Sequence, residues 1–222
     1  MTAIRSLIPA VLVLSLVGCV TAPKPQETAA LAVLASGADL HEKARACQEL
    51  SAYGGPAAVP ALAALLEQEH LADYARSGLE GIQDPAAGKA LRQALRRVSG
   101  RQLAGVVNSL GVRREIAAVP DLQGLALDAK RGVSSEALAS LGMIGTGEAA
   151  KTLQKVLTDG PAELRIPAAH ASFAAAAQLA KDGNHAAARG LLEHVVRTLP
   201  PGHLATVAQS QATALRANPV PK

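Results

Sequence analysis

The chain has 222 residues, of which 49% are hydrophobic and 18% charged, and its formal net charge is +4. This composition excludes a disordered chain, because so much apolar surface requires a packed core. Only Tyr53, Tyr74 and Phe173 are aromatic. A core built from Ala, Leu, Val and Ile suits closely spaced helices, so we expect an all-α fold with no β-sheet.

The first residues have the features of an export signal. Arg5 supplies a positive charge, and Leu7 to Val17 form an apolar stretch that is too short to span a bilayer. The stretch ends in Leu16-Val17-Gly18-Cys19, which resembles the lipobox of bacterial lipoproteins. The resemblance implies a signal peptide over residues 1–18, lipidation of Cys19, and an extracytoplasmic, lipid-anchored protein of the cell envelope, at the periplasmic face or the outer membrane. Two alternatives remain open: a secretory signal cut near Ala22, and retention in the cytoplasm.

Residues 19–28 are expected to form a flexible tether, because they combine Pro23 and Pro25 with a run of polar side chains. Cleavage before Cys19 would leave Cys47 as the one free thiol, which excludes an internal disulfide. Cys47 lies between Ala44 and Leu50 at helical spacing, and this predicts a buried side chain that packs as a small hydrophobe.

An internal repeat of about thirty residues dominates the segment 29–160. In each unit a leucine near the end of one apolar-periodic helix is followed, twelve positions later, by a leucine in the next helix. The pairs are Leu50 with Leu62, Leu79 with Leu91, Leu110 with Leu122, and Leu141 with Leu153. Turn residues separate the members of each pair, including Gly54-Gly55-Pro56, Gly111 and Gly145-Thr146-Gly147. About four units of helix, turn and helix are therefore predicted.

Two of the second helices contain a similar motif, Ala58-Val59-Pro60-Ala61-Leu62 and Ala118-Val119-Pro120-Asp121-Leu122. We expect Pro60 and Pro120 in the first turn of their helices, where no amide donor is needed. These motifs resemble the second helix of short bacterial HEAT-like repeats of the phycobilisome-lyase type. The resemblance implies a right-handed α-solenoid of stacked antiparallel helix pairs.

The C-terminal segment 161–217 keeps the twelve-residue offset in Leu179 with Leu191, but at a longer distance from the preceding unit. Its Gly183-Asn184-His185 sequence, followed by Pro200, is weakly similar to a tetratricopeptide unit. We expect a helical cap or a tetratricopeptide-like unit here, and a disordered tail over residues 218–222.

No catalytic residues, cofactor or metal ligands can be assigned from motifs. The six histidines form no His-Glu-x-x-His pair, and neither a Gly-x-Ser-x-Gly elbow nor a phosphate-binding loop of the Walker type is present.

The clearest uneven feature is a basic cluster between Pro85 and Arg114, which contains no Asp or Glu. Its members are Lys89, Arg92, Arg96, Arg97, Arg101, Arg113 and Arg114. They are interpreted either as a solvated face, balanced by acidic neighbours such as Glu80 and Asp121, or as a patch for an anionic partner such as an acidic protein, lipid headgroups or a polyanionic glycan. The scarcity of aromatic residues argues against nucleic acid.

Together these features predict a non-enzymatic scaffold, anchored in the membrane through Cys19, that binds an unidentified protein partner, for which an acidic surface would suit the basic cluster. Some proteins with related repeats attach bilins. The alternative is therefore a bilin-lyase-like enzyme or enzyme accessory that holds a small cofactor in the groove of the solenoid.

Overall fold

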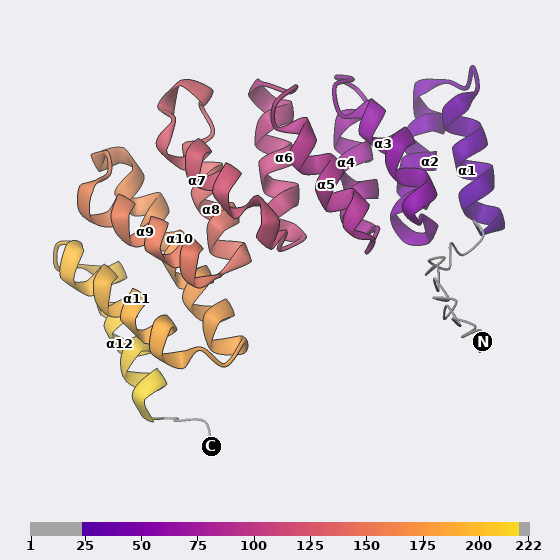
Figure 1. Ribbon diagram of the computed structural model, residues 1–222. Coiled ribbons are helices and arrows are strands. Elements are labelled where there is room, and N and C mark those ends of the chain that lie inside the picture. Colours follow the sequence, from indigo (N-terminus) through magenta and orange to yellow (C-terminus); the bar gives the residue numbers. More distant parts are fainter. Residues whose placement is uncertain (1–23, 218–222) are drawn as a thin grey trace, which may run out of the picture.

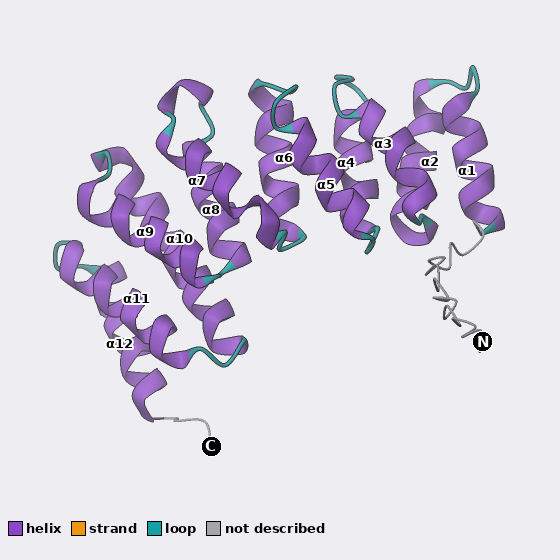
Figure 2. Cartoon of the chain, viewed as in Figure 1, coloured by secondary structure: helices purple, strands orange, loops and turns teal. Residues whose placement is uncertain are grey.

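The computed structural model describes residues 24–217, and the signal segment, Cys19 and the five C-terminal residues lie outside this range. Within it the protein is all-α: twelve α-helices and three short 3-10 helices are present, and no strand (Figure 2). The predicted fold class is thus confirmed at the level of secondary structure. The helices are α1 (Pro25–Ala35), α2 (Leu40–Tyr53), α3 (Val59–Leu65), α4 (Ala72–Gly81), α5 (Pro85–Ala94), α6 (Gly100–Val112), α7 (Val119–Leu127), α8 (Ser134–Ile144), α9 (Gly147–Asp159), α10 (Ala162–Lys181), α11 (His185–Thr198) and α12 (His203–Ala217).

The helices pack in the order in which they occur along the chain. One layer contains α2, α4, α6, α8 and α10, and each of these helices packs against the next. In the second layer, α3 packs against α5, and α7 packs against α9, which packs against α11. The helices α1 and α12 lie at the two ends, against α2 and α11 respectively. Figure 1 shows the resulting row, which runs from α1 to α6 and then turns through α7 to α12.

The buried core follows the row as a continuous aliphatic strip from Ala30 to Ala212. Tyr53 and Tyr74 are exposed, and Phe173 is only partly buried, so the buried part of this core contains no aromatic side chain. The structure places every leucine of the repeat pattern inside the core, with no more than 4% of any of them exposed. These leucines are Leu50, Leu62, Leu79, Leu91, Leu110, Leu122, Leu141, Leu153, Leu179 and Leu191.

Glycines at the contacts between neighbouring helices allow this close packing. Gly111 was expected in a turn, but it lies inside α6, where an added Cβ would come within 2.8 Å of the Ser140 Cα on α8. At Gly142 on α8 an added Cβ would come within 2.6 Å of the Ala171 carbonyl oxygen on α10. The helix backbones can approach this closely only because the side chain is missing.

The turns follow the sequence pattern in most units. Pro60 and Pro120 lie in the first turns of α3 and α7. Gly145 adopts a left-handed conformation with φ of 65° after α8, and the Thr146 hydroxyl then accepts from the Ala149 amide at the start of α9. Such a left-handed C-cap and hydroxyl N-cap together end one helix and begin the next.

The first helix corrects the expected extent of the tether. α1 begins at Pro25, within the segment 19–28 that was expected to be flexible, because proline suits the first helical position. Glu27 is only 4% exposed, and its Oε1 accepts a hydrogen bond of 2.8 Å from the Gly55 amide. Residues 25–28 therefore belong to the folded part of the molecule.

The segment 161–217 continues the row. The 20-residue helix α10 packs against α8, α9 and α11, and α11 also packs against α9. In the range 24–217, none of the helices combines the length and apolar character needed to cross a bilayer.

Candidate functional site

The residues of the basic cluster occupy three separate places. Lys89, Arg92 and Arg96 lie along α5 and its C-terminal turn. Arg97 and Arg101 flank the connection from α5 to α6, and the pair Arg113 and Arg114 follows α6. The last four side chains all have carboxylate or carbonyl partners within the fold, as described next.

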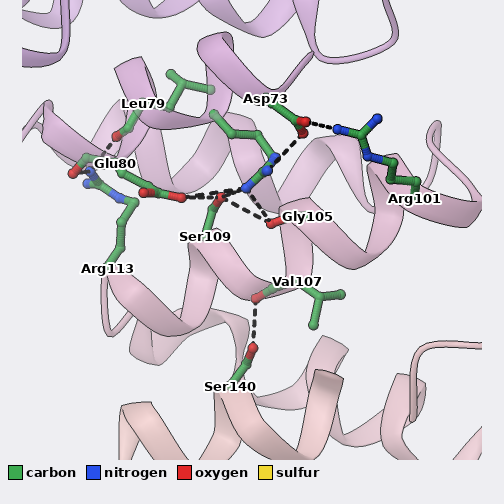
Figure 3. Close-up of polar contacts among 10 residues, drawn as sticks. Asp73, Leu79, Glu80, Arg101, Gly105, Val107, Ser109, Arg113 and Ser140 are labelled. Atoms are coloured by element: carbon green, nitrogen blue, oxygen red, sulfur yellow. Dashed lines mark hydrogen bonds and ion pairs between the residues drawn. The ribbon is translucent and has the colours of Figure 1, made fainter. Parts of the chain in front are cut away.

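Arg113 binds the end of α4 (Figure 3). Its Nη1 donates to the carbonyl oxygens of Leu79 at 2.6 Å and Glu80 at 3.2 Å, and also to that of Ile82. Its Nη2 donates to the Asp84 carbonyl at 3.3 Å. Carbonyl groups at a helix C-terminus have no partner within the helix, so this guanidinium caps α4 from the neighbouring unit.

Arg114 joins the ends of three successive units. Its backbone has a positive φ of 50°, and its Nη2 donates to the carbonyl of Ile144, the last residue of α8, at 3.1 Å and to the Asp182 Oδ2 after α10 at 2.8 Å. The hydrogen bond from Arg114 holds the pKa of the Asp182 carboxyl below its usual value. This arginine therefore bridges the turns that follow α6, α8 and α10.

Arg97 and Arg101 are both ion-paired. The Arg97 Nε lies 3.2 Å from the Glu67 Oε1, and Arg101 pairs with Asp73 (Figure 3). Asp73 also accepts from Arg76 at 2.9 Å. The hydrogen bond from Arg76, followed by the nearby charges of Arg76 and Arg101, lowers the pKa of Asp73.

A groove of about 590 Å³ lies between α5 and the segment that contains α7, and we refer to it as the α5–α7 groove. Lys89, Arg92 and Arg96 line its α5 side, and Glu115 and Asp121 line the other. A smaller cavity of about 380 Å³, which shares Arg96 and Asp121 with it, extends toward the ends of these two helices.

The groove arises from an interruption in the second helix layer. α3 packs against α5 and α7 against α9, but α5 and α7 make far less contact with each other. The first layer is continuous at the same point, because α4, α6 and α8 pack in succession. The two units thus meet where α6 packs against α4 and α5, and the space between α5 and α7 stays open to solvent.

The charges in the α5–α7 groove are only partly neutralised. The Arg92 Nε lies 3.4 Å from the Asp121 Oδ2 across the groove, and the two side chains are 37% and 36% exposed. Lys89 and Arg96 are exposed, and neither forms an ion pair with any residue in the described range. Glu115 lies over Gly88 of α5, where an added Cβ would overlap its carboxylate. The groove therefore has two available cationic side chains, Lys89 on α5 and Arg96 in the turn after it.

A polar network between α4 and α6 was not predicted from the sequence (Figure 3). The buried Ser109 hydroxyl donates to the Glu80 Oε1 at 2.6 Å and accepts from the Arg76 Nη1 at 3.0 Å. One unit later, the buried Ser140 hydroxyl donates to the Val107 carbonyl at 2.9 Å. Both serines directly precede a core leucine of the repeat, and this recurrence is the signal that could have revealed them.

Two further reactive side chains, His194 and Cys47, lie at helix contacts. The His194 Nε2 on α11 lies 2.9 Å from the Thr158 Oγ1 and 3.2 Å from the Gln154 carbonyl oxygen, both on α9. Cys47 is fully buried, as its spacing predicted, and burial raises the pKa of its thiol to about 11. Among residues 24–217, no three His, Cys, Asp or Glu side chains are grouped so that they could hold a metal ion.

Comparison with known proteins does not identify a family. No protein-family model matches this chain, and no curated protein matches it either. A function can therefore be inferred only from the sequence, the fold and the geometry of the α5–α7 groove.

Proposed function

We propose that this protein is a non-enzymatic, membrane-tethered α-solenoid of the HEAT-like class, a scaffold that binds another protein at the bacterial cell envelope. The observation that carries the proposal is the serial packing of helix pairs in two layers, interrupted between α5 and α7 by an open, charged groove. Rows of helix pairs present an extended surface to a partner while each unit is stabilised by its neighbours. The repeated motifs around Pro60 and Pro120 support the same class.

The proposed anchor is a lipid on Cys19, in the lipobox-like sequence Leu16-Val17-Gly18-Cys19. α1 begins at Pro25, so only residues 20–24 would separate the lipidated cysteine from the first helix. An extended chain spans at most about 3.6 Å per residue, which places the start of α1 within roughly 20 Å of the anchor. The helical row would then be held close to the membrane surface.

The experiment is affinity capture from solubilised envelopes of cells that produce the full-length protein with a C-terminal tag. The matched control is residues 1–24 fused to the same tag, which retains the proposed signal and anchor but lacks the helices. Recovery of a protein with the full chain alone supports the scaffold, whereas identical recoveries from the two samples contradict it. A visible absorbance band in the purified full-length protein would favour the alternative, an accessory that holds a chromophore.

The anchor has its own test, mass spectrometry of the N-terminal peptide of the membrane-bound protein. An acylated Cys19 at the new N-terminus is expected, and the Cys19→Ser variant should leave the membrane fraction. An intact Met1 would contradict the tether.

A further inference from the structure

The α5–α7 groove has walls of opposite charge, and the basic wall is less neutralised. Lys89 and Arg96 have no ion-pair partner within the described range, whereas Asp121 on the facing wall already pairs with Arg92. The gap between α5 and α7 also leaves the side of α5 that faces α7 without a packed helix of its own layer. A ligand in the groove would therefore meet a row of cations along α5 and the turn that follows it.

We propose that the α5–α7 groove binds an extended acidic segment of a protein partner, with carboxylates on alternate residues directed at Lys89, Arg92 and Arg96. The proposal rests on the scaffold function above, and it specifies the chemistry of the partner. Complementary charges of this kind contribute more to the specificity and the association rate of a complex than to its affinity.

The spacing of the cations fits such a segment. Lys89 and Arg92 are three residues apart on α5 and share one face of the helix, and Arg96 lies in the turn that follows Ala94, against the same groove. A helical rise of 1.5 Å per residue separates Lys89 and Arg92 by about 4.5 Å along the axis. In an extended chain, side chains on the same side recur every 6.6 Å or so. The long, flexible side chains of Lys89 and Arg96, one on each side of Arg92, can cover the remaining difference, so carboxylates on alternate residues can reach all three cations.

The wall that contains Glu115 and Asp121 determines which residues can lie between the carboxylates of the bound segment. In an extended segment every second side chain points the opposite way, here toward Glu115 and Asp121. Acidic side chains at those positions would be repelled, so the intervening residues should be neutral or basic. The groove thus distinguishes an alternating sequence from a uniformly acidic one.

Arg92 can exchange partners during binding. Its contact with Asp121 is long at 3.4 Å, and both side chains are more than one third exposed. Ion pairs of this kind contribute little to stability because solvent screens them. A carboxylate of the ligand can therefore replace Asp121 without a large cost to the fold.

The geometry favours a peptide over a lipid surface. The three cations line a groove of about 590 Å³, which takes a few side chains but is recessed from a flat bilayer. Headgroups that approached the opening would also meet Glu115 and Asp121. A narrow chain can enter the space between α5 and α7, whereas a planar anionic surface cannot.

The test measures binding of a fluorescein-labelled decapeptide of alternating Glu and Ser to the full-length protein in a neutral detergent, by fluorescence anisotropy. The double variant K89E/R96E should weaken the affinity at least about tenfold at low ionic strength, because two attractive contacts become repulsive. The matched control is K155E/R165E, which makes the same change of charge at exposed residues outside the groove, on α9 and α10. Its affinity should stay within about twofold of wild type, and added salt should weaken binding of the wild-type protein.

Several outcomes would overturn the proposal. One is an equal loss of peptide affinity in K89E/R96E and K155E/R165E, which would mean that the peptide responds only to the net charge of the protein. A second is equal affinity for a decapeptide of alternating Lys and Ser. A third is binding to vesicles rich in phosphatidylglycerol, but not to the acidic peptide, that depends on Lys89 and Arg96; this would assign the groove to the membrane. If circular dichroism shows that K89E/R96E loses helix, K89Q/R96Q takes its place, with K155Q/R165Q as its control.

The affinity capture separates this inference from the scaffold function. If the full chain recovers a partner that K89E/R96E recovers equally well, the groove proposal is wrong and the scaffold stands. If no partner is recovered, the scaffold function itself fails, whatever the peptide does.

Discussion

Arg113 belongs to the basic cluster of the sequence, but its guanidinium is used in hydrogen bonds within the fold. Its guanidinium lies against the last carbonyl groups of α4, including those of Leu79 and Glu80, and provides donors that these groups would otherwise lack. Arg101, a member of the same basic cluster, has a side chain that is 77% exposed and makes an ion pair on the surface. The sequence places both in one basic run but cannot distinguish them, because the partners of Arg113 are backbone atoms of the preceding unit.

We predict that Arg113→Ala lowers the free energy of unfolding by about 2–4 kcal/mol, because several partly buried carbonyl groups lose a charged donor. Arg101→Ala removes an exposed ion pair and should cost at most about 1 kcal/mol. Urea unfolding followed by circular dichroism measures both values. Similar losses for the two variants would contradict the capping role of Arg113. Arg113→Lys should not restore the full stability, since one ammonium cannot reproduce the planar fork of donors.

Cys47 gives a second prediction at the residue scale. The thiol is fully buried and its pKa is raised to about 11, so at pH 8 only a very small fraction is thiolate. We expect iodoacetamide to alkylate Cys47 slowly in the native protein and rapidly in concentrated urea. Mass spectrometry of the peptide that contains Cys47 gives both rates. Rapid alkylation without denaturant would show that the α2 contacts around this residue open easily.

At the scale of helices, the repeat of leucines predicted which faces are buried, but it did not predict how closely the helices approach. The pattern of Leu110 and Leu141 is sufficient to identify the core, because apolar residues at helical spacing must be covered. Gly111 was interpreted as a turn residue, since glycine commonly ends a helix. It instead provides the contact between α6 and α8. Only the packed structure separates these two uses of glycine, because both depend on the missing side chain.

The pair Gly142→Ala and Gly190→Ala tests this use of glycine with one chemical change. A Cβ at Gly142 would come within 2.6 Å of the Ala171 carbonyl oxygen, whereas a Cβ at Gly190 on α11 would meet no atom within 4 Å. Gly142→Ala should therefore destabilise the protein by about 1–3 kcal/mol through forced separation of α8 and α10. Gly190→Ala should stabilise it by roughly 0.5–1 kcal/mol, the difference in helix propensity. Thermal unfolding checks both signs, and stabilisation by Gly142→Ala would refute the close contact.

At the scale of the whole molecule, Arg114 connects turns that are far apart in the sequence. Its hydrogen bond to Asp182 joins residues 68 positions apart in the sequence. The same guanidinium group also donates to the Ile144 carbonyl oxygen. The positive φ of Arg114 allows this side chain to leave the end of α6 in the required direction. One side chain thus ties together the ends of α6, α8 and α10.

The lowered pKa of Asp182 makes this tie sensitive to acid. The folded pKa lies below the unfolded one, which is about 3.9, so the stabilisation is present above that value and is lost as the pH falls through the folded pKa. The stability difference between wild type and Asp182→Asn should therefore be largest above about pH 5 and should shrink as the pH falls below 4 or so. Melting temperatures across this range measure it. Glu69→Gln, at an exposed carboxylate without an ion pair in the described range, is the control and should follow wild type. A constant difference at all pH values would rule out the linkage.

The candidate site was only partly predictable. Helical spacing predicted that Lys89, Arg92 and Arg96 share one helix face; α5 ends at Ala94, so Arg96 instead reaches the same groove from the turn after the helix. Asp121 was expected as an acid that could balance the cluster, and it contacts Arg92. The groove itself could not be predicted, because it depends on the angle at which one helix pair meets the next. That angle is set by many contacts between α4, α6 and α8, none of which a local pattern encodes.

The interruption between α5 and α7 also bears on cooperativity. In a linear array, the free energy that couples adjacent units resides in their shared interfaces, and at this boundary the contact between second-layer helices is largely missing. The segments before and after this boundary communicate through α6, which packs against both α4 and α8. Among partly unfolded states that begin at either end, the one that stops at this boundary should therefore cost the least free energy, because it breaks the weakest interface. The stretches on the two sides of the boundary, which α6 connects, can then unfold one at a time.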